Sequence, residues 1–117
     1  MAKRARYTDQ DAEIDLRKLR YFRAVAEQLN FGRAAQELIL AQPALSRAIK
    51  SLENDLGVVL FDRDHHTVRL TEAGKVLVAE ADSLLARAGT ARRRVRAAAS
   101  PVTTQAPVPA AAAVPAT

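Results

Sequence analysis

Residues 41–53 read AQPALSRAIKSLE, and a helical period of 3.6 residues divides them into two faces. The apolar face carries Leu45, Ile49 and Leu52, with Leu56 following in the same row. The polar face carries Pro43, Ser46, Arg47, Lys50 and Asn54. Proline is tolerated in a first helical turn because its missing N–H would have no partner there. We therefore predict a helix from about Gln42 to Leu56, with one face packed and the other facing solvent or a ligand.

Two further helices are predicted before this one. Asp15 is a plausible N-cap, and apolar residues recur after it at three- and four-residue spacing up to about 28–30. The segment FGRAAQELI, residues 31–39, predicts a short second helix with Gly32 at its cap and small alanines that allow close packing. Gly57 is expected to stop the third helix.

After Gly57 the pattern changes to VVLFDR, DHHT and VRL, two short apolar runs around a polar turn, which is typical of a small hairpin. Thr71 and Glu72 then begin a long helix that extends to about Ala97. Its apolar seam is formed by Leu77, Ala81, Leu84, Ala88, Ala91 and Val95. The predicted fold is mainly α: a winged helix-turn-helix of three helices and a β-hairpin wing, followed by a long dimerisation or linker helix.

Composition sets the domain boundaries. We expect a flexible basic arm at 1–13, a winged helix-turn-helix domain at 14–71, a linker helix at 72–97 and a disordered Ala/Pro-rich tail at 98–117. The chain has no Cys, only two His, and no Ser with a base at a suggestive spacing. We therefore expect no metal site, no cofactor and no enzymatic activity.

The charge balance favours a polyanionic partner. Lys and Arg number 18 against 13 Asp and Glu, which gives a formal net charge of +5. The charged N-terminus lacks the apolar core of a signal peptide, and no apolar run is long enough to span a membrane. These features predict a soluble, cytoplasmic protein with no membrane partner.

The polar face of the third helix has the chemistry of a DNA reader. An α-helix fits the major groove of double-stranded DNA, where Arg donates bidentately to guanine and Gln to adenine. Gln42, Ser46, Arg47 and Lys50 lie near the helix start, where a recognition helix meets bases. A solvated surface is the alternative for an isolated helix, and the surrounding helices and hairpin favour DNA binding instead.

Three motifs together resemble the DNA-binding domain of LysR-type transcriptional regulators: QPALSR, the LE..LG..LF.R pattern at 52–63, and LTEAG at 70–74. The resemblance implies a helix-turn-helix at 31–50 and a wing at about 59–70. It also implies that Gln42, Pro43, Ala44, Ser46 and Arg47 meet the major groove. His66 would approach the flanking minor groove, and Arg33 would contact phosphate. For Arg63, phosphate contact and a structural role over the hairpin remain equal alternatives.

The resemblance also implies a homodimer through the linker helix, acting as a sequence-specific transcription regulator. Two alternatives are a truncated interaction protein that heterodimerises with full-length relatives and a non-specific DNA-binding protein. LysR-type regulators usually continue into an effector-binding domain, which this sequence lacks. We therefore expect no small-molecule inducer site in this chain. We also expect the chain to be either a natural short form or a truncated or frame-shifted product. Arg87, Arg92, Arg93, Arg94 and Arg96 form a basic end whose contact, DNA phosphate or solvent, is left open.

Overall fold

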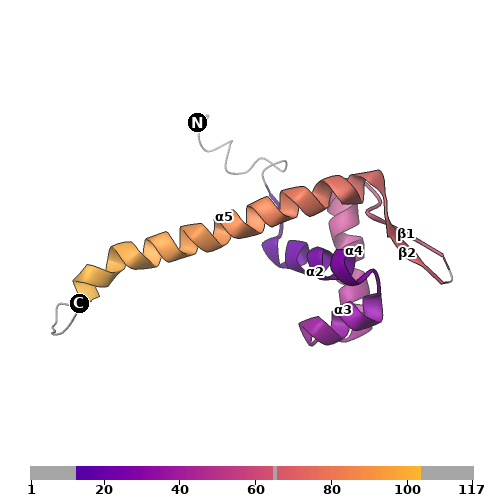
Figure 1. Ribbon diagram of the computed structural model, residues 1–117, viewed down its shortest axis with the longest axis horizontal. Coiled ribbons are helices and arrows are strands. Elements are labelled where there is room, and N and C mark those ends of the chain that lie inside the picture. Colours follow the sequence, from indigo (N-terminus) through magenta and orange to yellow (C-terminus); the bar gives the residue numbers. More distant parts are fainter. Residues whose placement is uncertain (1–12, 65, 104–117) are drawn as a thin grey trace. The chain divides into compact units, whose positions relative to one another are not determined.

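The computed structural model describes residues 13–64 and 66–103. Its elements, in chain order, are α2 (Leu16–Gln28), α3 (Phe31–Leu38), α4 (Gln42–Leu56), β1 (Phe61–Arg63), β2 (Val68–Leu70) and α5 (Glu72–Thr103). The strands form an antiparallel hairpin in which Phe61 pairs with Leu70 and Arg63 with Val68 (Figure 1). The predicted fold, a mainly helical winged helix-turn-helix followed by a long helix, is confirmed. The chain divides into two compact units, with the boundary between Leu85 and Ala86.

Side-chain caps fix the starts of α2 and α3. The Asp15 carboxylate accepts hydrogen bonds from the N–H groups of Arg17 (2.9 Å) and Lys18 (3.3 Å), as predicted for an N-cap. The cap of α3 was predicted wrongly. Asn30, not Gly32, is its N-cap, because the Asn30 side-chain oxygen accepts from the Arg33 N–H at 2.8 Å and glycine has no side chain to do so.

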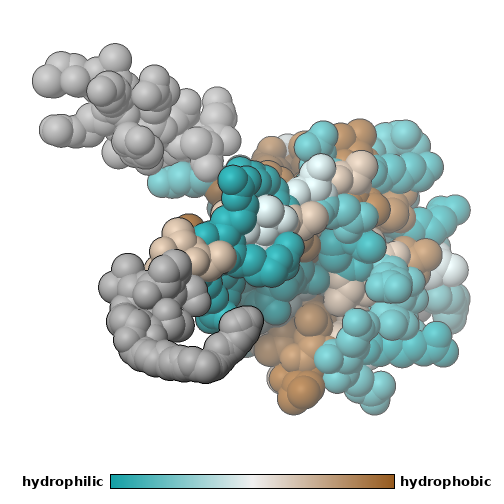
Figure 2. Space-filling model, turned by 60° about the vertical axis from the view of Figure 1, so that its left-hand side comes forward, coloured by the Kyte–Doolittle hydropathy of each residue, from teal (hydrophilic) through white to brown (hydrophobic). Residues whose placement is uncertain are grey.

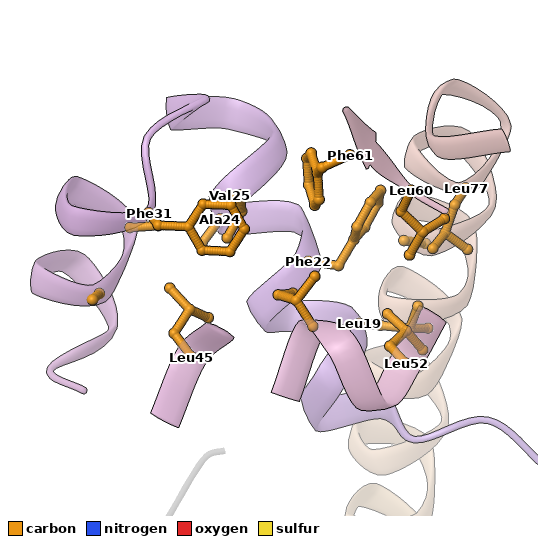
Figure 3. Close-up of a cluster of buried hydrophobic side chains, with 14 residues drawn as sticks. Leu19, Phe22, Ala24, Val25, Phe31, Leu45, Leu52, Leu60, Phe61 and Leu77 are labelled. Carbon is orange, nitrogen blue, oxygen red and sulfur yellow. The ribbon is translucent and has the colours of Figure 1, made fainter. Parts of the chain in front are cut away.

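The hydrophobic core lies among α2, α3, α4, the start of the hairpin and the first turns of α5. Phe22 of α2 and Phe61 of β1 have ring centroids 5.3 Å apart, and Phe31 meets Phe61 edge-on at 5.9 Å (Figure 3). The remaining core residues are Leu19, Ala24, Val25, Ala34, Ala35, Leu45, Ile49, Leu52, Leu60, Leu77 and Ala81. The hairpin is therefore fixed to the helices through its first strand.

Thr71 joins the hairpin to α5. Its hydroxyl donates to the Val59 carbonyl at 2.6 Å and accepts from the Gly74 N–H at 3.0 Å, so it caps α5 as predicted. Gly74 is required by close approach, since a Cβ at this position would lie 2.3 Å from the Leu60 carbonyl oxygen. The chain therefore turns tightly from wing to helix.

The structure corrects two expectations about α5. The helix ends at Thr103 rather than Ala97, because the alanines at 97–99 have high helix propensity and continue it into the predicted tail. Leu77 and Ala81, predicted to face a partner helix, are buried in the core of their own unit. Of the predicted arm (1–13) and tail (98–117), residues 1–12 and 104–117 lie outside the described residues. In the described part of the chain, no helix is long and apolar enough to cross a membrane.

Candidate nucleic-acid interface

α4 presents the polar face that the sequence predicted. Leu45, Ile49 and Leu52 are no more than 1% exposed, which fixes the rotation of the helix about its axis. Four side chains on the other side are exposed, those of Gln42, Pro43, Arg47 and Lys50. Ala44 and Ser46 are half-buried. The two-faced helix inferred from the period of 3.6 is thus confirmed. Its polar face is available to a ligand along its first two turns.

Two neighbouring hollows connect this face to the wing. The larger, of about 620 Å³, is open and is lined by Ser46, Arg47 and Lys50 from α4 together with Asp62 and Arg63 from β1. The second is lined by the N-terminal ends of α3 and α4 and by the wing turn, including Asn30, Gln42, Ser46, Arg63, Asp64 and His66. The structure therefore brings together Gln42, Ser46, Arg47, Lys50, Arg63 and His66. Arg33, Pro43 and Ala44 line neither hollow.

Arg63 has a structural contact. Its guanidinium carbon lies 4.4 Å from the centroid of the Phe31 ring, a cation–π arrangement in which the wing stacks on the start of α3. Phe31 in turn packs edge-on against Phe61. The side chain is also exposed, so its donors face the hollows on either side. Arg63 thus has a packing contact with α3, and a phosphate contact from its exposed side stays a prediction.

One carboxylate organises the wing turn. Asp64 Oδ1 accepts from the N–H groups of His66 (3.0 Å) and Thr67 (2.8 Å) and from the Thr67 hydroxyl (2.9 Å). These hydrogen bonds lower the pKa of Asp64 below its usual value of 3.8, and the one from the His66 N–H has the largest effect. The positive charge of Arg69 lowers this pKa further. The hydrogen bonds set the backbone that carries His66, whereas residue 65 lies outside the described part. Nowhere in that part do three His, Asp or Glu side chains gather to hold a metal ion.

Glu53 is a positioning residue that the sequence prediction missed. It is 7% exposed, and its Oε2 accepts from the N–H groups of Leu60 (2.8 Å) and Phe61 (3.3 Å). A buried carboxylate is stable only when it is hydrogen-bonded, and here it ties the start of β1 to α4. The available signal was the position of Glu53, beside Leu52 and four residues after Ile49, at the edge of the apolar face. These hydrogen bonds hold the start of the wing on α4 in addition to the aromatic contacts of Phe61.

Comparison with known proteins identifies the domain. Residues 16–75 match the family of bacterial regulatory helix-turn-helix proteins named the lysR family. The chain belongs to the LysR family. Among its relatives, the transcriptional regulator XapR of Escherichia coli is 53% identical over 81 residues, which cover 69% of this chain and 28% of XapR. ClcR of Pseudomonas putida is 49% identical over 85 residues, covering 73% of this chain and 29% of ClcR. The chain thus spans less than a third of the length of these LysR relatives.

Solved LysR structures agree with the fold. The crystal structure of the CbnR_DBD–DNA complex matches with a TM-score of 0.71 and 44% identity, over 74% of this chain and 99% of that one. The BenM_DBD/catB site 1 DNA complex matches with a TM-score of 0.70 and 39% identity, over 74% and 97%. Both matched chains are DNA-binding domains crystallised with DNA. This chain therefore contains a LysR-type DNA-binding domain, and its named relatives are transcriptional regulators.

Proposed function

We propose that this protein is a transcription regulator that binds selected sequences of double-stranded DNA as a homodimer in the bacterial cytoplasm. The observation that carries the proposal is the polar face of α4, which is exposed and shares its two hollows with the wing. A helix of this width enters the major groove, and a wing beside it reaches the flanking minor groove. Family membership supports the same mode of binding.

The roles of the side chains follow from their chemistry. Arg47 donates bidentately to the O6 and N7 of guanine, Gln42 pairs with the N6 and N7 of adenine, and Ser46 donates to or accepts from a base edge or phosphate. Lys50, Arg33 and Arg63 contact phosphates, and His66 approaches the minor groove. Pro43 and Ala44 offer apolar contact at the helix start. Base contacts set the selected sequence, whereas phosphate contacts set the register.

Self-association rests on the part of the seam that the core leaves uncovered. Leu84 is 38% exposed and Val95 70% exposed, and Ala88 and Ala91 lie between them in the same row. The dimer would hold two copies of α4 at a fixed separation.

Selection from a library of random duplexes tests the proposal. We expect the protein to enrich one motif made of two half-sites, spaced by about one helical turn of DNA or a multiple of it. The bound fraction should fall steeply with salt, because phosphate contacts release counterions. Retention of DNA with no enriched motif would contradict the proposal and would identify a non-specific DNA-binding protein instead.

A further inference from the structure

The part of α5 that follows Asp82 is strongly basic and contains no acidic residue. Asp82 is the last carboxylate in the sequence, and Arg87, Arg92, Arg93, Arg94 and Arg96 follow it. All five arginines are exposed, and the end of α5 that comes forward in Figure 2 is mainly hydrophilic. The ion pairs found among the described residues involve Lys18, Arg23 and Lys75, not these arginines. Five positive charges therefore lie on one helical segment without a neutralising partner of its own.

The arginines surround the apolar stripe of this segment. At 100° per residue, Arg87 and Arg94 fall on one side of the stripe formed by Leu84, Ala88, Ala91 and Val95. Arg92 and Arg96 fall on its other side, and Arg93 lies opposite. A partner on the stripe therefore leaves arginines accessible along both edges and on the far face. Pairing of the stripe and binding of an anion are compatible.

This arrangement costs helix stability. Arg92 and Arg96 are four residues apart, and a like-charge pair at that spacing destabilises a helix. The helix dipole favours cations only within the last turn, and α5 continues from Arg96 to Thr103. Among the described residues, Arg93 donates to the Thr90 hydroxyl, at 3.2 Å. The charges are thus unfavourable in the isolated helix and become favourable when an anion is bound.

We infer that this basic end of α5 is a second nucleic-acid contact, which binds the phosphate backbone of duplex DNA without regard to base sequence. The segment from Arg87 to Arg96 spans about 14 Å of helix, and duplex DNA carries one charge per about 1.7 Å of axis. Arginine binds phosphate bidentately. A lipid surface fits less well, because insertion needs large apolar side chains and the stripe contains two alanines and no aromatic residue. Because the polyanion is DNA, this contact rests on the proposed function, and it lies outside α4.

A salt titration with a duplex of random sequence tests the second contact in the full chain. Arg92→Gln/Arg96→Gln removes two phosphate partners, so the slope of log affinity against log salt should fall by about 1.8 per bound chain. The ratio of affinity for a selected duplex to that for the random one should not change. Arg17→Gln/Arg20→Gln is the matched control, since it removes two exposed arginines from α2, and its slope should stay within error of the unmodified protein.

Two further measurements exclude other readings. Arg96→Glu replaces a repulsive pair with an attractive one, so helicity by circular dichroism should rise or stay constant while affinity for DNA falls. If the salt slope of Arg92→Gln/Arg96→Gln equals that of the matched control, the second contact is overturned, even where α4 still selects its motif. Loss of binding to phosphatidylserine vesicles with an unchanged DNA slope would also overturn it, in favour of a lipid surface. Failure of the proposed function has a different signature, the absence of any selected motif.

Discussion

Glu53 and Gly74 fix the start of the wing and the start of α5 within the domain. The buried carboxylate of Glu53 satisfies the N–H groups of Leu60 and Phe61, where the wing begins. We expect Glu53→Ala to lower the free energy of unfolding by about 3 kcal/mol, because it leaves both donors without a protein acceptor. Glu53→Gln keeps one oxygen and should cost about 1 kcal/mol. Urea denaturation measures the free energy of unfolding of both variants. Glu80→Ala, at an exposed position, is the control, and its free energy of unfolding should stay within about 0.5 kcal/mol of that of the unmodified protein. Equal losses for the Ala and Gln variants would contradict this role.

The close approach of the backbone at Gly74 gives a second prediction. The Leu60 carbonyl oxygen that a Cβ would meet also accepts from the Thr71 N–H at 3.0 Å, so it is held in place. We expect Gly74→Ala to lower the melting temperature, with a loss of about 2 kcal/mol or more. Gly89→Ala, in the same helix with only the end of the Arg93 side chain nearby, should raise stability by about 0.5–1 kcal/mol. A gain in both variants would show that the turn into α5 can relax.

Sequence alone predicted the side chains whose role follows from helical spacing. The cap at Asp15 and the exposed Arg47 and Lys50 needed only local patterns. Asn30 and Glu53 were missed for different physical reasons. The cap of α3 lies two residues before Gly32, where the Asn30 side chain accepts from a backbone N–H. The partners of Glu53 lie across a tertiary contact that periodicity does not describe.

At the scale of the element, the wing turn depends on one ionised carboxylate. The folded-state pKa of Asp64 is lowered below its usual value of 3.8, so the carboxylate stabilises the turn at pH values above about 3.8. That contribution is lost as the pH falls through the lowered pKa. We expect the backbone amide signals of His66 and Thr67 to shift, and the protection of these amides against hydrogen exchange to fall, in this acidic range. Asp64→Asn should remove the transition, and its persistence in that variant would assign it to another group.

The elements themselves were largely predictable, and their surroundings were not. The three helices, the hairpin and the start of α5 follow from periods and turn residues. The seam of α5 shows the limit, because the core of the domain buries only the first part of this apolar row. Leu77 and Ala81 face their own core, whereas Val95 is 70% exposed. Spacing identifies an apolar row but does not say which part of it the small domain already covers.

At the scale of the whole molecule, the exposed part of that row predicts self-association. Val95→Arg places a charge in the proposed pairing stripe, beside arginines that already flank it. We expect the dissociation constant of the dimer, measured by sedimentation equilibrium, to rise at least about tenfold. Ala86→Arg, an exposed position on the opposite side of α5, is the matched control and should leave it unchanged. Unchanged association in both variants would exclude this stripe as the dimer contact.

Substitution of Arg47 tests whether α4 reads base sequence. Arg47 is exposed and lines the larger hollow without supporting the core, so Arg47→Ala should leave the melting temperature unchanged. The measurement is the ratio of affinities for a selected duplex and a random duplex at one salt concentration. We predict that this ratio falls about ten- to a hundredfold, the contribution of one bidentate base contact. An unchanged ratio of affinities in a folded Arg47→Ala protein would contradict the reading of base sequence by α4 through Arg47.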